Sequence, residues 1–81
     1  MRVRVRFFAA LREEVGRESL ALELDEPATP EDAWRRVVAD HPQVADRRKS
    51  LSAAVNRRYA SFAAALSEGD EIVFIPPVSG G

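Results

Sequence analysis

The sequence predicts an α+β domain in which a mixed β-sheet packs against one main helix. Three observations predict this class. Short segments with alternating apolar and polar residues lie near the start of the chain and again in its second half, as half-exposed strands do. One central segment has the spacing and capping signals of a helix. The last apolar segment is apolar on both faces, which is typical of a central strand in a sheet covered at least partly on both sides.

The chain begins with two expected strands joined by a short helical segment. Residues 2–7 alternate arginine with valine or phenylalanine, so one face is basic and the other apolar. Phe8 falls on the arginine side, where an aromatic ring is out of place. Residues 9–15 are rich in helix formers, and Gly16 suits the position after a helix end. Residues 20–24 alternate again, and we expect this second strand to pair with the first.

The main helix is expected to begin at Thr29. The Thr29 hydroxyl can cap the first turn, Pro30 suits the first helical position, and two acidic residues follow at the positive end of the helix dipole. The helix should end before Pro42. Its apolar residues recur at helical spacing and form an inward stripe: Trp34, Val37 and Val38.

The rest of the domain is expected to be mostly strand. We expect, in order, a polar loop over 43–50 with room for a helical turn, strands over 51–55 and 59–62, and a last strand over 71–75. Asn56 tolerates the left-handed conformation that a turn between the first two of these strands requires. Gly69 suits the turn before the last strand.

Beyond residue 75 the chain changes character, since its last six residues are Pro76, Pro77, Val78, Ser79, Gly80 and Gly81. Proline has no N–H to donate to a sheet, and glycine adopts nearly any backbone angle. We therefore expect a domain over residues 1–75 and a flexible, extended tail over 76–81 that reaches roughly 20 Å. Such a tail could carry the carboxylate of Gly81 through a narrow channel into another protein.

Composition excludes several classes of function. Among 81 residues the net charge is −1, whereas nucleic-acid proteins usually carry a basic excess. No apolar segment approaches the roughly 20 residues that span a bilayer, so we expect a cytoplasmic protein. The chain has no cysteine and only one histidine, His41, and therefore no recognisable metal site. The paired basic residues, such as those at 47–49, are expected to be solvated surface, because acidic residues are interspersed among them.

The chain also lacks the signs of an independent enzyme. It contains neither of the common glycine-rich phosphate-binding motifs, and Ser79 has no activating base near it in sequence. The carboxylate of Gly81 is the one group in a distinctive context. A carboxylate is a poor electrophile, but it becomes reactive when another enzyme adenylates it with ATP.

These residues resemble the MoaD family, the small subunits of molybdopterin synthase. The resemblance is most specific in the last six residues, and it extends through residues 5–13, 53–56 and 69–72 to nearly the whole chain. It implies a ubiquitin-like β-grasp fold. It also implies a sulfur carrier that is not catalytic alone, because the catalytic pocket of the synthase belongs to the large subunit.

The resemblance further implies a set of partners. A ubiquitin-activating-like adenylyltransferase would use ATP to adenylate Gly81, and a sulfur donor would convert it to a thiocarboxylate. The large subunit would accept the inserted tail, residues 76–80, and pass sulfur to a pyranopterin precursor of molybdopterin. No cofactor is expected on the chain itself, since ATP is used by the activating enzyme.

Three alternatives stay open from the sequence. The same diglycine end suits a sulfur carrier for thiamin synthesis or tRNA thiolation. It equally suits a ubiquitin-like modifier that forms isopeptide bonds with lysines. A plain interaction module with an accidental Gly-Gly end is the third.

A surface for the large subunit is expected near the base of the tail. Phe8 interrupts the basic face of the first strand, Tyr59 lies near a turn, and Ile75 precedes the tail. We expect these three side chains to form an exposed apolar patch, because aromatic anchors are common at the centres of interfaces. The competing interpretation places Phe8 and Ile75 in the hydrophobic core.

Overall fold

The computed structural model describes residues 1–77 of the chain. Its elements in order are β1 (Arg2–Phe7), α1 (Ala9–Val15), β2 (Ser19–Glu23), α2 (Pro30–Asp40), the 3-10 helix η1 (Pro42–Ser50), β3 (Ser52–Val55), β4 (Arg58–Ala60) and β5 (Glu71–Ile75). Within these residues the strands form one sheet in the order β2-β1-β5-β3-β4. Strands β1 and β5 are parallel and the other neighbours are antiparallel, so the predicted mixed sheet is confirmed.

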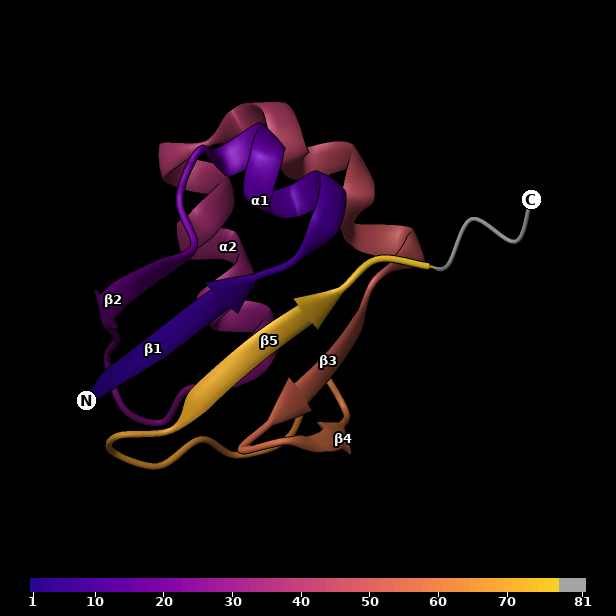
Figure 1. Ribbon diagram of the computed structural model, residues 1–81. Coiled ribbons are helices and arrows are strands. Elements are labelled where there is room, and N and C mark those ends of the chain that lie inside the picture. Colours follow the sequence, from indigo (N-terminus) through magenta and orange to yellow (C-terminus); the bar gives the residue numbers. More distant parts are fainter. Residues whose placement is uncertain (78–81) are drawn as a thin grey trace.

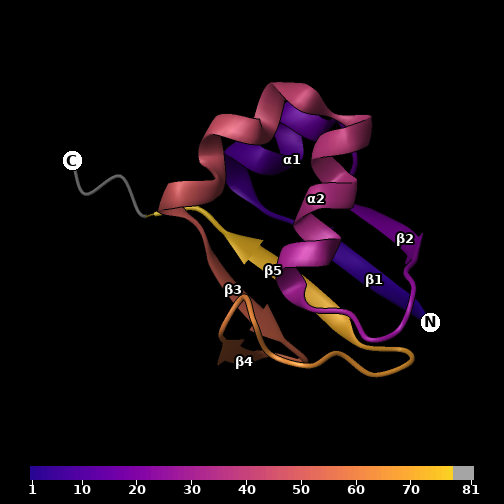
Figure 2. The same cartoon turned by 180° about the vertical axis from the view of Figure 1, so that it is seen from behind.

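The helical segments all lie on one side of the sheet, and β5 runs through its centre (Figures 1 and 2). This side holds the core, because the apolar residues of β1 (Val3, Val5 and Phe7) alternate with exposed arginines. Phe74 of β5 is fully buried and meets Trp34 of α2 edge to face, with ring centroids 5.1 Å apart. Burying one face of each strand against the helices is what selects this layering.

Helix α2 begins as the sequence predicts. Thr29 and Asp32 form a reciprocal capping box: the Thr29 hydroxyl accepts from the Asp32 N–H at 3.2 Å, and the Asp32 carboxylate accepts from the Thr29 N–H at 2.9 Å. The side chains of Trp34 and Val37 are buried on the side of the helix that faces the sheet. The helix ends at Asp40, and the N–H of His41 closes the last turn on the Val37 carbonyl at 2.8 Å.

Two predicted segments differ in the structure. The polar stretch 43–50 is not a loop but belongs to η1, because Val44 is fully buried and anchors it to the core. The strand expected over 59–62 covers Arg58–Ala60 instead. Phe62 lies beyond that strand and stacks on Phe74 with centroids 5.9 Å apart, so core packing outweighs strand propensity there.

The apolar residues of β5 that do not face the core lie on the opposite face of the sheet. Val73 and Ile75 point away from the helices, on the face that also carries the arginines of β1. No helix of the described chain covers this face, contrary to the expected cover on both sides (Figures 1 and 2). We call it the open face. None of the helices within residues 1–77 has the length and apolarity needed to cross a membrane.

Candidate functional site

A cavity of about 310 Å³ lies on the open face along β5, from Glu71 at the start of the strand to Ile75, where the tail departs. It is the candidate site and is called here the docking cavity. Its lining residues are Arg6, Phe8, Ala54, Arg57, Tyr59, Glu71, Val73 and Ile75. The floor is mostly apolar and the rim is charged.

The structure brings the three predicted patch residues together. Phe8 is 46% exposed and Tyr59 is 78% exposed, and they are the only large hydrophobic side chains exposed among residues 1–77. Ile75 is half-buried. Phe8 is therefore not a core residue, and all three side chains line the docking cavity. Their predicted role in binding a partner stays a prediction.

The sheet register explains how distant segments meet here. Ala54 of β3 lies opposite Val73 of β5 and opposite Tyr59 of β4, so these three side chains share the open face. Phe8 follows β1 directly and stands at the N-terminal end of α1 in extended conformation. The guanidinium carbon of Arg6 lies 5.8 Å from the centre of the Phe8 ring, within cation–π range.

Arg57 was not predicted as a site residue. It belongs to the two-residue turn between β3 and β4, in which Asn56 and Arg57 both have positive φ, 51° and 71°. The Asn56 side chain ties this turn to the start of β5: its amide donates to the Asp70 carboxylate at 2.9 Å and its oxygen accepts from the Glu71 N–H at 3.0 Å. The sequence indicated that Asn56 would adopt a left-handed conformation, but it gave no sign that Arg57 would lie on the rim of the cavity.

The arginines of the open face differ in whether an acidic side chain opposes them. Arg2 pairs with Glu23 at 3.1 Å, and Arg6 approaches Glu71 at 3.9 Å. Arg4 reaches only the Ser19 hydroxyl, at 3.5 Å, and within residues 1–77 Arg57 makes no ion pair. Glu23 and Glu71 are thus opposed by arginines, whereas the carboxylates of Glu68 and Asp70 accept hydrogen bonds from the backbone or from Asn56.

The tail leaves directly from the cavity. Ile75 pairs with Ser52 at the end of β5, and Pro76 and Pro77 follow without regular structure. The remaining predicted tail residues, Val78, Ser79, Gly80 and Gly81, lie outside the described residues. The predicted chemistry at the Gly81 carboxylate and the predicted tail insertion therefore stay predictions.

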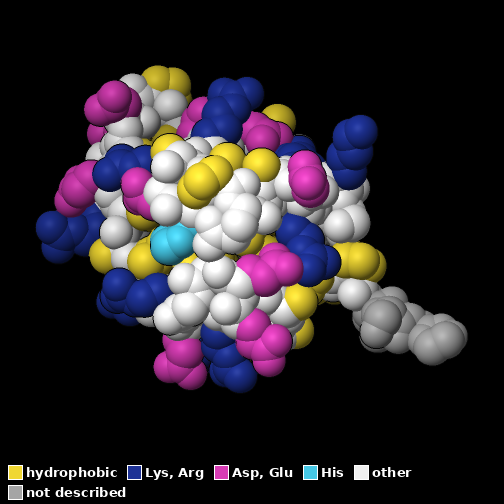
Figure 3. All heavy atoms as spheres, turned by 90° about the horizontal axis from the view of Figure 1, so that it is seen from above, with side chains coloured by type: hydrophobic (Ala, Val, Ile, Leu, Met, Phe, Trp, Pro, Cys, Tyr) yellow, Lys and Arg dark blue, Asp and Glu magenta, His cyan; other side chains and the backbone are white. Residues whose placement is uncertain are grey.

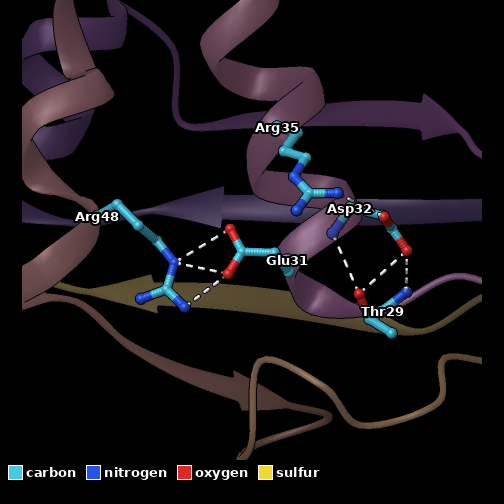
Figure 4. A network of polar contacts seen from close by, with 5 residues as sticks. All are labelled: Thr29, Glu31, Asp32, Arg35 and Arg48. Atoms are coloured by element: carbon cyan, nitrogen blue, oxygen red, sulfur yellow. Dashed lines mark hydrogen bonds and ion pairs between the residues drawn. The ribbon is translucent and has the colours of Figure 1, made fainter.

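A second cluster of polar groups lies on the other side of the molecule (Figure 4). Arg48 of η1 binds the Glu31 carboxylate of α2, with Nε 2.9 Å from Oε1, and its guanidinium stacks 3.5 Å from the centre of the Phe62 ring. Hydrogen bonds from Arg48 hold the pKa of Glu31 below its ordinary value. Arg48 is therefore not the solvated side chain that the sequence suggested, and the cluster fastens η1 to α2.

A similar ion pair joins Arg47 of η1 to Glu14 of α1, where hydrogen bonding lowers the pKa of Glu14. Over the helical side as a whole, acidic and basic side chains are interspersed (Figure 3). Within residues 1–77 no three metal-ligating side chains gather. The docking cavity is thus the feature of the described chain best suited to bind another molecule.

Comparison with known proteins places the chain in a family. A model of the ThiS family matches residues 5–81. The chain is 36% identical to the molybdopterin synthase sulfur carrier subunit of Chlamydomonas reinhardtii, covering all of both chains. It is 39% identical to the subunit of that name from Escherichia coli, covering 98% of this chain and 99% of the relative. The crystal structure of SAMP1 from Haloferax volcanii superposes over all of both chains with a TM-score of 0.91 at 29% identity.

Proposed function

The chain belongs to the ThiS family, and we propose that it is the sulfur carrier subunit of a molybdopterin synthase. Its fold is the ubiquitin-like β-grasp that the resemblance predicted. The observation that carries the proposal is the similarity to sulfur carrier subunits of this synthase, at 36% and 39% identity over nearly the full length of both chains. The family model also matches through Gly81.

In the proposed reaction the chain supplies a carboxylate and no catalytic side chain. An adenylyltransferase joins the Gly81 carboxylate to AMP with release of pyrophosphate. A sulfur donor then displaces AMP, and a thiocarboxylate results. The large subunit supplies the catalytic pocket, where the sulfur atom passes to the pyranopterin precursor. ATP is consumed by the activating enzyme, so this chain needs no cofactor of its own.

The docking cavity supports the proposal because one end of it, at Ile75, borders the start of the tail. An aromatic and aliphatic patch of Phe8, Tyr59 and Ile75 suits the centre of an interface, and its place beside Pro76 would aim the tail into the bound partner. The relatives are named as subunits, so a partner subunit is part of the proposal.

The test begins with the intact mass of the chain after incubation with ATP, the adenylyltransferase of the same genome and a sulfur donor. We expect one oxygen atom to be replaced by sulfur. The loaded chain, mixed with the large subunit and the precursor, should then form molybdopterin. A chain that is never loaded, or that is loaded but supports no molybdopterin, would contradict the proposal.

The tail provides the sharpest variants. Adding one residue after Gly81 converts the reactive carboxylate into a peptide bond, and deleting Gly81 moves the carboxylate back by about 3.5 Å. Misplacement by 1 Å can lower a rate about a hundredfold when positioning dominates. Both variants should keep the wild-type melting temperature and lose sulfur transfer. Molybdopterin formation by an untrimmed, extended chain would exclude the mechanism.

A second candidate function is supported by the close superposition on SAMP1, a small archaeal modifier protein. The activated glycine would then form isopeptide bonds with lysines of other proteins. The same incubation separates the two functions when a lysate of the source organism is added. Conjugates of higher mass indicate a modifier, whereas a thiocarboxylate that persists and yields molybdopterin indicates a carrier.

A further inference from the structure

The turn that carries Arg57 is built against ordinary backbone preference. A two-residue hairpin turn with positive φ at both positions strongly favours Asn followed by Gly, because glycine has no Cβ to clash. Here Asn56 is present, but Arg57 occupies the second position at φ 71°. Bulky residues held in this region are strained, and such strain is concentrated at functional sites. The strain raises the question of what the side chain of Arg57 contributes.

The side chain of Arg57 lies on the rim of the docking cavity. It faces the same space as Tyr59 and Val73, and the hydrogen bonds of Asn56 to Asp70 and Glu71 hold the turn in place. Arg57 is exposed and makes no ion pair within residues 1–77. It therefore presents a positive charge beside an apolar cavity, at a position fixed by the fold.

Charge complementarity then indicates the chemistry of the occupant. Glu23 and Glu71 are opposed by Arg2 and Arg6, and the Asp70 carboxylate beside the turn accepts hydrogen bonds from the Asn56 amide and the Ser67 N–H. Arg57 has no ion-pair partner within residues 1–77, so its charge is available to a carboxylate of a partner. Apolar lining with a basic rim fits an apolar side chain that has a carboxylate next to it.

We propose that Arg57 determines partner specificity: the docking cavity receives an apolar side chain of the large synthase subunit, and an adjacent carboxylate of that subunit pairs with Arg57. This inference rests on the proposed function. The backbone strain at Arg57 is retained because glycine, which fits the turn better, cannot supply the charge.

The strain makes a decisive variant available. Arg57→Gly gives the preferred Asn-Gly turn, so its melting temperature should equal or exceed that of the wild type. Its affinity for the large subunit encoded in the same genome should nevertheless be about tenfold lower at low salt, with a shallower dependence on salt. Arg57→Glu should bind more weakly still, and reversing the partner's carboxylate to lysine should restore its binding.

The matched control is the neighbouring arginine. Arg58 is exposed but lies opposite Val55, on the face of β4 turned away from the cavity. Arg57→Ala should weaken binding in a titration calorimetry experiment, and Arg58→Ala should not. Equal effects of the two would show general electrostatic attraction and overturn the inference.

Three other outcomes would overturn the inference. If the Arg57 variants bind the large subunit with the same affinity as the wild type, this inference is overturned and the proposed function stands. No binding by the wild-type chain overturns both. The chain alone can also be tested for a dimer. If it forms one and Arg57→Gly dissociates it, a second copy occupies the cavity and the inference is overturned.

Discussion

Single residues of this protein divide into those that maintain the fold and those that the fold displays. Phe74 and Phe62 stack on the core side of β5, with their ring centroids 5.9 Å apart. Phe8 is equally large but is 46% exposed on the open face. Truncation of an exposed phenylalanine removes little from the core, and an exposed aromatic ring beside an apolar cavity suits contact with another protein.

Truncation of Phe8 tests this division. Phe8→Ala should weaken binding of the large subunit by about 2 kcal/mol or more, as loss of an aromatic interface anchor does. The melting temperature should change little, because the ring is half exposed. Titration calorimetry and thermal unfolding measure the two quantities separately.

Phe62→Ala provides the contrast, because Phe62 packs against Phe74 and carries the Arg48 guanidinium on its ring. It should lower the melting temperature and leave the affinity of the folded protein nearly unchanged. If Phe8→Ala unfolds the domain with no separate binding defect, Phe8 belongs to the core after all.

At the scale of elements, the main helix depends on its first turn. The capping box of Thr29 and Asp32 satisfies two N–H groups that the helix would otherwise leave without partners. Thr29→Ala should therefore reduce the free energy of unfolding by about 1 kcal/mol, measured by urea denaturation.

Thr29→Ser keeps the capping oxygen and should retain most of that stability. Neither change should affect sulfur loading at temperatures where the domain stays folded, because Thr29 lies away from the docking cavity. A Thr29→Ala domain of wild-type stability would show that the cap contributes nothing.

The ion pair between α2 and η1 should make stability depend on pH. Arg48 lowers the pKa of Glu31 in the folded state. The pair therefore stabilises the fold above the unfolded pKa of about 4.3, and this contribution is lost as the pH falls through the lower, folded value.

Glu31→Gln removes the charge but keeps the shape. Its free energy of unfolding should fall below that of the wild type at pH 7, and the difference should shrink steadily as the medium is acidified below about pH 4.3. Chemical denaturation across this pH range measures it. A difference independent of pH would show that the charge of Glu31 does not contribute.

At the scale of the whole molecule, a domain of 81 residues has a small core and little stability to spare. Stability of about 4–12 kcal/mol is typical for this length. The sheet depends on β5, which lies at its centre and pairs with both β1 and β3. Its fully buried Phe74 joins the sheet to Trp34 of α2.

Phe74→Ala should therefore cost about 3–5 kcal/mol and leave the domain largely unfolded at elevated temperature. Phe74→Leu fills most of the space and should cost clearly less. Circular dichroism melts of the two variants provide the comparison. Near-wild-type stability of Phe74→Ala would contradict a core organised around β5.

The sequence alone determined the local structure and the family. Alternation identified the first two strands, apolarity on both faces identified the last, and the capping signals at Thr29 and Pro30 located the start of α2. These patterns depend on neighbours within a few residues. Phe8 was recognised as misplaced by the same alternation. The diglycine end pointed to sulfur carriers, and the relatives bear this out.

Only the tertiary structure decided which residues meet. Phe8, Ile75 and the neighbouring pair Arg57 and Tyr59 come from three separate segments, and strand order and register bring them around one cavity. The ion pair of Arg48 and the packing of Phe62 likewise depend on partners far away in the chain. Local patterns encode the face on which a side chain lies, but pairing between strands is a long-range outcome of burying the core. The sequence predicted that Phe8, Tyr59 and Ile75 would meet, but the rest of the cavity lining, and Arg57 above all, emerged only from the folded molecule.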